Sequence, residues 1–261
     1  VSITMLIAII FFMQIAPGYV KDPPKTSKIR MILNNNIINN LKNDIIFIDN
    51  KTYLSIDDIR NYFDEFLKEE DNRFITTYAG NTAVIAKNSN AVYLNGEYIN
   101  FSTQPLYDKE NSKYYLSLDD LNKVYDYEMR YNPYTKVVII DTKSKKLVKA
   151  KSKNNFSIKY KATKLSKTVD KIVKNDEIII VQNDNNSDYE VEGWVRVRTP
   201  NAKIGYIDKN DIMDRSVSWG GNNKNDDLHR VSIAWEYYPE GDSAPIKSDK
   251  IKGINVVSPS L

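Results

Sequence analysis

The feature that most constrains the fold of this chain is an internal repeat. Three short blocks in the first half of the chain recur in the same order further along. Because the order is preserved, the repeat predicts two copies of one small supersecondary unit. The paired blocks are Leu-Asn-Asn-Asn-Ile-Ile-Asn (33–39) with Leu-Asn-Gly-Glu-Tyr-Ile-Asn (94–100), Tyr-Leu-Ser-Ile-Asp-Asp-Ile (53–59) with Tyr-Leu-Ser-Leu-Asp-Asp-Leu (115–121), and 74–86 with 127–139.

Each copy is expected to contain a short strand, a turn, a second strand, a brief helix and a closing hairpin. Asn95-Gly96 predicts a tight hairpin turn, because both residues tolerate positive φ. Ser55 and Ser117 are expected to cap the two helices, with Asp58 and Asp120 three residues further on. The repeat therefore predicts a duplicated α+β domain over residues 31–142.

Paired carboxylates in the two helices raise the question of general acid–base chemistry. Asp57-Asp58 and Asp119-Asp120 both fall in helix first turns, where the helix dipole already favours negative charge. The chain has no cysteine and a single histidine, His229, so thiolate catalysis, disulfides and His-rich metal sites are excluded. We expect no catalytic residues, no metal and no cofactor.

The repeated Tyr-Leu-Ser-[Ile/Leu]-Asp-Asp motifs and the Leu-Asn-x-x-x-Ile-Asn hairpins resemble the copper amine oxidase N-terminal-like domain. That family is a duplicated α+β stalk module on secreted proteins of Gram-positive bacteria. The resemblance implies a stalk over residues 31–142. It implies no copper, because this region contains no histidine ligand.

The N-terminal residues 1–16 are almost entirely apolar, and the first charge is Lys21. A stretch of this length is marginal for the ~30 Å hydrocarbon core of a membrane and is typical of a signal-peptide hydrophobic region. Residues 1–20 are therefore expected to form a hydrophobic helix that acts as a signal anchor or transmembrane helix, or alternatively as a cleaved signal. Either interpretation exports the rest of the chain.

Residues 143–174 contain twelve lysines and a single acid, Asp170. Such a run is usually a solvated face, or here partly a linker. The alternative is attraction to a polyanion such as teichoic acid, nucleic acid or anionic lipid. Nucleic acid is not an expected partner, because few aromatic residues are interleaved with the lysines and because the chain is expected to be exported.

Short β-segments from residue 156 onward predict a small closed barrel. The stretch Trp-Val-Arg-Val-Arg (194–198) alternates strictly, so its tryptophan and two arginines share one face and its two valines the other. Gly-Trp-Val-Arg-Val followed by Lys-Ile-Gly-Tyr-Ile (203–207) resembles the bacterial SH3-like domain, here expected over residues 150–214. Ala202 stands where that family usually has glycine.

Domains of this kind often bind cell-wall peptide or glycan, so the resemblance implies contact with the wall. Trp194, Arg196 and Tyr206 are the candidate residues for binding a wall ligand. The alternative for Trp194 is that it serves as a core or rim aromatic.

The last segment, 228–261, holds Val-Ser-Ile-Ala-Trp-Glu (231–236) and Gly-Ile-Asn-Val-Val-Ser-Pro (253–259). This pair resembles the entry into the barrel of glycoside hydrolase family 18 (chitinase-like), and we expect it to be a truncated start of such a domain. The family's Asp-x-x-Asp-x-Asp-x-Glu motif does not occur in the chain, so no hydrolysis is expected from it. The alternative is an irregular tail.

Together these patterns predict an α+β and all-β chain: an N-terminal hydrophobic helix, a duplicated α+β stalk and an SH3-like β-barrel. The expected function is the non-catalytic N-terminal part of an exported, cell-envelope glycoside hydrolase family 18 protein that acts on peptidoglycan or chitin-type glycans. The alternatives are a stand-alone wall-binding or scaffold protein, and a surface sensor or adhesin. The expected location is the membrane-anchored, extracellular face of a Gram-positive-type bacterium, with peptidoglycan or another wall polymer as partner.

Overall fold

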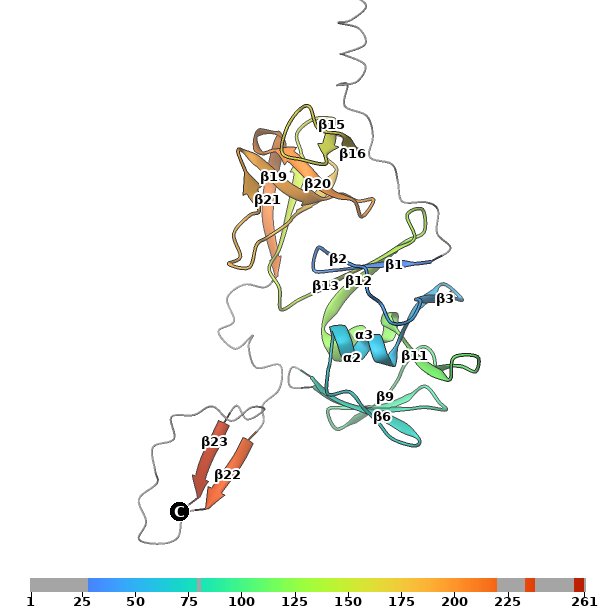
Figure 1. Cartoon of the computed structure of the whole chain (residues 1–261). Helices are drawn as coiled ribbons and strands as arrows, with labels where there is room; N and C mark the ends of the chain where they lie inside the picture. Colours follow the sequence, from blue (N-terminus) through green and yellow to red (C-terminus); the bar gives the residue numbers. More distant parts are fainter. Residues whose placement is uncertain (1–27, 79–80, 220–232, 238–255, 261) are drawn as a thin grey trace, which may run out of the picture. The chain divides into compact units, whose positions relative to one another are not determined.

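The computed structural model describes residues 28–78 and 81–219, together with the backbone of two strands at 233–237 and 256–260 (Figure 1). It divides into two compact units, 1–52 with 126–222 and 53–125 with 223–261. The described residues are mostly β, with two α-helices, which agrees with the strand-rich prediction. The predicted N-terminal helix at 1–20 lies outside the described residues. Within them, no helix has the length and apolar character needed to cross a membrane.

The first unit contains a four-stranded sheet in the order β12-β13-β1-β2. Its central strand β13 is a Val-Val-Ile-Ile run that is buried throughout, as expected for a strand covered on both faces. It pairs in parallel with β1 and antiparallel with β12. The strands are β1 (Arg30–Leu33), β2 (Asn36–Ile38), β12 (Tyr127–Asn132) and β13 (Val137–Thr142). The short strand β3 (Ile46–Ile48) follows β2 along the chain.

The rest of the first unit is one all-β sheet, with strand path β16-β15-β20-β19-β17-β14-β21 and β18 added beside β19. The strands are β14 (Leu147–Ser152), β15 (Phe156–Lys159), β16 (Thr168–Ile172), β17 (Glu177–Ile180), β18 (Glu190–Val191), β19 (Trp194–Arg198), β20 (Ile204–Asp208) and β21 (Ile212–Trp219), with a 3₁₀ turn η1 (Lys209–Asp211) before the last. We call this sheet the barrel, because strands from both ends of its path contribute to one core.

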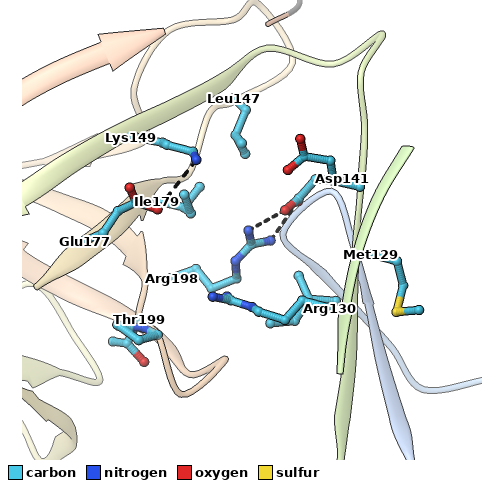
Figure 2. Close-up of a pocket in the computed structure, with 12 residues that line it drawn as sticks. Met129, Arg130, Asp141, Leu147, Lys149, Glu177, Ile179, Arg198 and Thr199 are labelled. Carbon is cyan, nitrogen blue, oxygen red and sulfur yellow. Dashed lines mark hydrogen bonds and ion pairs between the residues drawn. The ribbon is translucent and has the colours of Figure 1, made fainter. Parts of the chain in front are cut away.

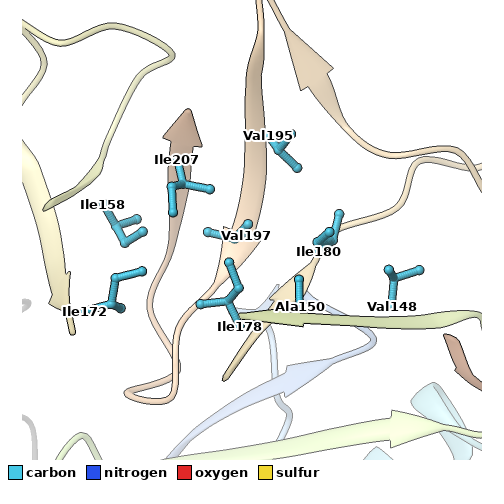
Figure 3. Packing of buried hydrophobic residues seen from close by; sticks show 9 residues of the cluster. All are labelled: Val148, Ala150, Ile158, Ile172, Ile178, Ile180, Val195, Val197 and Ile207. Atoms are coloured by element: carbon cyan, nitrogen blue, oxygen red, sulfur yellow. The ribbon is translucent and has the colours of Figure 1, made fainter. Parts of the chain in front are cut away.

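That core is a cluster of nine buried aliphatic residues (Figure 3). Val195 and Val197, the two valines of the alternating stretch, point into it, as their period-2 spacing predicted. Ile172 of β16 and Val148 of β14 lie in the same cluster, which shows that the sheet curls around it. Each buried aliphatic side chain of this size contributes about 1.5–3 kcal/mol.

The second unit contains both α-helices and a five-stranded antiparallel sheet, β5-β6-β7-β8-β9. Strand β11 pairs antiparallel with β10 and with β4, and β4 and β11 lead directly into α2 and α3. The elements are β4 (Lys51–Ser55), α2 (Ile56–Tyr62), β5 (Lys68–Glu69), β6 (Arg73–Tyr78), β7 (Asn81–Ala86), β8 (Ala91–Leu94), β9 (Glu97–Asn100), β10 (Leu106–Asp108), β11 (Lys113–Ser117) and α3 (Leu118–Tyr125). The sequence hairpin, hairpin, helix, hairpin thus occurs twice along the chain.

The two helix starts differ in how their polar groups are satisfied. Ser55 caps α2 as predicted, accepting a hydrogen bond from the backbone N–H of Asp58 at 3.1 Å. The matching prediction for Ser117 is wrong, because its Oγ is buried with no hydrogen-bond partner in the described part of the chain. Asp120 instead accepts hydrogen bonds from Ser102, at 2.8 Å from the backbone nitrogen and 2.7 Å from the hydroxyl. The carboxylate therefore ties the preceding loop to α3.

The predicted hairpin turn at Asn95-Gly96 is confirmed, with φ of 51° and 94° between β8 and β9. Asn34 and Asn35, at the corresponding place in the first copy, take φ of 48° and 67° between β1 and β2. Asparagine tolerates this left-handed region better than most residues, so the same tight turn forms in both hairpins.

Near the C-terminus, β22 (Ile233–Tyr237) and β23 (Val256–Ser260) form a parallel pair. These two strands overlap the stretches 231–236 and 253–259 that resemble the entry into a barrel.

Candidate ligand-binding surface

Four side chains form a row across neighbouring strands on the outer face of the barrel. Arg196 of β19 is the cross-strand partner of Tyr206 of β20, and Tyr206 is in turn the partner of Lys159 of β15. On the other side, the backbone nitrogen of Arg196 donates to the carbonyl of Tyr189 at 2.9 Å. We call Tyr189, Arg196, Tyr206 and Lys159 the outer row. It alternates aromatic and cationic groups.

Three members of the outer row touch one another, while the ammonium of Lys159 donates to the hydroxyl of Thr168 at 3.4 Å. The guanidinium carbon of Arg196 lies 5.2 Å from the ring centroid of Tyr189, a cation–π distance. The rings of Tyr189 and Tyr206 meet edge to face, with centroids 6.4 Å apart. Tyr189 is 37% exposed, and the other three members are half-buried. These contacts hold the rings in place while leaving part of their surface open to solvent.

Burial favours the neutral form of Tyr206 in the outer row. Partial burial raises the pKa of Tyr206, and Tyr189 raises it further, while Arg196 acts in the opposite direction. The hydroxyl therefore remains a hydrogen-bond donor through the physiological pH range.

Of the three predicted site residues, two are neighbours on the open face and the third is buried. Arg196 and Tyr206 are direct neighbours. Trp194 is only 8% exposed and packs against Phe156, with ring centroids 6.2 Å apart. Trp194 thus occupies the place of a packing aromatic, the alternative left open by its sequence.

Arg198, two residues along the same strand face, is not part of the open surface. It is 1% exposed, and its two terminal nitrogens donate to the carboxylate of Asp141 on β13 at 2.8 and 2.6 Å (Figure 2). A bidentate pair of this kind is geometrically specific. The end of β19 is therefore tied to the β12–β13 hairpin, and the open part of the face ends at Arg196.

A small apolar cluster adds to this contact within the first unit. Ala202, in the β19–β20 turn, is 8% exposed and packs with Ile32, Val137 and Ile139 of the four-stranded sheet. Its φ is 61°, the left-handed region that normally favours glycine. Ala202 therefore places its methyl group in this cluster.

Tyr189 and Lys159 are the members of the outer row that sequence reasoning missed. The signal for Tyr189 was the Glu192-Gly193 pair, whose φ values of 48° and 81° close a two-residue hairpin between β18 and β19. That hairpin brings the segment before it alongside Arg196. Recognising it in the sequence would have placed Tyr189 next to the predicted site.

Three of the twelve lysines of the 143–174 run pair with acids among the described residues, and Lys149 does so with Glu177 at 3.6 Å. Lys143 pairs with Asp126 at 2.8 Å, and Lys151 with Asp214 at 3.4 Å. Asp170, the single acid of the run, is buried and accepts from Thr199 at 2.5 Å. Lys153 donates to the carbonyl of Asn210 at 2.6 Å. These contacts agree with a solvated face.

Metal-ligating side chains do not cluster in the part of the chain that the structure describes, where no group of three His, Cys, Asp or Glu residues lies close enough to hold an ion. His229 lies outside the described residues.

Comparison with known proteins gives only distant likeness. No protein-family model matches the chain, and no curated protein matches it. Two solved structures are similar, NlpC2 and NlpC1 from Trichomonas vaginalis, each with 12% identity over 55% of this chain and a TM-score of 0.22. The match covers 36% and 34% of those chains. A likeness this weak carries no argument about function.

Proposed function

We propose that this chain is a non-catalytic binding part of an exported cell-envelope protein, and that the outer row binds a cell-wall polymer such as peptidoglycan. The observation that carries the proposal is the alternation of two tyrosine rings with two cations on one open face. The barrel would then be the SH3-like module to which its Gly-Trp-Val-Arg-Val stretch is similar.

The chemistry of the outer row suits a glycan that bears peptides. Tyrosine rings offer flat apolar faces together with a hydroxyl that bonds polar groups, a combination favoured at binding surfaces. Arg196 and Lys159 supply positive charge beside those rings, which suits the carboxylates of wall peptides. A ligand with both sugar rings and carboxylates would use both kinds of group at once.

Fixed geometry is the second argument for this surface. The ring contacts of Tyr189 with Arg196 and Tyr206 hold the side chains before a ligand arrives. Side chains that are already ordered lose little conformational entropy on binding. The outer row is therefore better suited to bind a ligand than single exposed aromatic side chains would be, because its rings are already ordered.

We further propose that the chain belongs to a larger glycoside hydrolase family 18 protein, with residues 1–20 as membrane anchor and 31–142 as the stalk. The parallel pairing of β22 with β23 is in keeping with this extension, because neighbouring strands of a (β/α)₈ barrel run parallel. The stalk and barrel would raise the concentration of the enzyme at the wall. A stand-alone wall-binding or scaffold protein is the alternative, and the coding sequence after Leu261 separates the two. An Asp-x-x-Asp-x-Asp-x-Glu motif there supports the hydrolase, and a stop codon contradicts it.

Wall binding is tested by sedimenting the full chain with purified, insoluble peptidoglycan and measuring the bound fraction. The wild type is expected to bind saturably, and Tyr206→Ala to bind about tenfold more weakly, as for a residue at the centre of a binding surface. Tyr134→Ala is the matched control, because Tyr134 is 95% exposed on the same unit and lies outside the outer row. Equal retention of wild type and Tyr206→Ala would overturn the proposal.

A further inference from the structure

A pocket of about 200 Å³ lies in the first unit beside Arg198, and all the residues that line it belong to that unit. Charged side chains from β12, β13, β14, β17 and β19 line it (Figure 2). Its cations are Arg130, Lys149 and Arg198, and its acids are Glu128, Asp141 and Glu177.

The acids are accounted for by the groups around them. Asp141 accepts both terminal nitrogens of Arg198. Glu177 lies 3.6 Å from the ammonium of Lys149. Glu128 is exposed on β12, where solvent screens its charge. Little acceptor capacity therefore remains inside the pocket.

Two arginines of the pocket, in contrast, have hydrogen-bond donors without an acceptor among the described residues. The Nε of Arg198 is buried and has no hydrogen-bond partner among the described residues. Arg130 extends toward Arg198 in Figure 2 and makes no hydrogen bond or ion pair within the described part of the chain. Loss of hydration lowers the pKa of Arg130, and repulsion from Arg198 lowers it further, against the opposing pull of Asp141 and Glu177. The buried Nε of Arg198 is the more costly of the two, because a buried donor without a partner costs about 1–3 kcal/mol.

We propose that this pocket binds a small oxyanion, a carboxylate or a phosphate group, between the guanidinium of Arg130 and the Nε of Arg198. Guanidinium groups match the planar, two-oxygen geometry of such anions better than ammonium groups do. The anion would satisfy the buried Nε and relieve the repulsion between the two arginines. The site is independent of the outer row, from which Arg198 is turned away by its pairing with Asp141.

The test is isothermal titration of the full chain with sodium phosphate and, separately, sodium acetate, at pH 7 and at an ionic strength held constant with sodium chloride. Saturable binding of either anion is expected, and the anion that binds identifies the ligand class. Arg130→Gln is expected to lose about tenfold in affinity, the value of one charge-assisted hydrogen bond. Arg130 is exposed, so this variant is expected to fold.

Arg215→Gln is the matched control, because Arg215 is half-exposed, pairs with Asp188 at 2.8 Å outside the pocket, and carries the same charge. It should keep the wild-type affinity. Absence of saturable binding by both anions, or equal losses in the two variants, would overturn the proposal. In the peptidoglycan sedimentation assay, Arg130→Gln should bind as wild type does. The proposals for the anion site and for the outer row are therefore tested separately.

Discussion

Replacing Asp141 by leucine is expected to destabilise the first unit, because it leaves the guanidinium of Arg198 buried without its counter-ion. Arg198 is 1% exposed, and Asp141 accepts both of its terminal nitrogens. Removing one partner of a buried pair costs about 3–5 kcal/mol, whereas replacing both by apolar residues is often neutral or stabilising. The double variant Asp141→Leu/Arg198→Met should therefore recover most of the loss.

The structure places the expected loss at the lower end of that range, about 3 kcal/mol. The side chain of Asp141 is 13% exposed, so water can fill part of the space it leaves and soften the penalty. Arg130 acts the other way, because its charge continues to repel Arg198 once Asp141 is gone. Asp141→Leu should consequently cost more than Arg198→Met, which relieves that repulsion. A loss of about 3 kcal/mol corresponds to a fall in Tm of roughly 6–12 °C for a domain of this size.

The measurement is a double-mutant cycle from urea unfolding of the full chain, followed by tryptophan fluorescence with Trp194 as the buried reporter in the barrel. The control is Glu190→Leu, which breaks the exposed Lys209–Glu190 pair (54% and 40% exposed) and should cost under about 1 kcal/mol. The reasoning is refuted if Asp141→Leu costs no more than this control, or if the double variant is as unstable as the sum of the two single variants.

Two further predictions concern packing and pH. Gly205→Ala should destabilise the barrel by about 2–3 kcal/mol in the same unfolding assay, because a Cβ there would lie 2.6 Å from the backbone oxygen of Lys159 and 2.7 Å from Ile158; a loss under about 0.5 kcal/mol would contradict this close approach. Burial raises the pKa of Tyr125 above its ordinary 10.0, so the folded chain holds this proton more tightly than the unfolded chain. That stability is full below about pH 10 and is lost as pH rises further. Tyr125→Phe keeps the stacking on Phe63 and should reduce the fall in unfolding free energy between pH 9 and pH 11, and an unchanged fall would contradict the assignment.

Local patterns predicted the local structure well. The alternation of 194–198 placed Val195 and Val197 in the barrel core, and Asn95-Gly96 formed its turn. These features depend on backbone preferences and on period-2 geometry, which the neighbouring residues alone determine.

Contacts between residues distant in sequence could not be predicted from the local patterns. Alternation put Arg198 on the outer face, but its burial depends on Asp141, 57 residues away. Ser117 occupies the same place in its copy as Ser55, yet Asp120 is drawn instead to Ser102. In both cases a partner distant in sequence competes with the local preference, and one sequence does not reveal which partner wins.

The central claim, that the outer row binds a wall polymer, is tested most directly by peptidoglycan binding of wild type and Tyr206→Ala at about 1 M sodium chloride. At that salt the Debye length is about 3 Å, so attraction of the lysine-rich run to wall polyanions is screened while ring stacking persists. We predict that wild type still binds saturably and that Tyr206→Ala binds about tenfold more weakly. Loss of wild-type binding at high salt, or equal binding by the two proteins, would contradict the account.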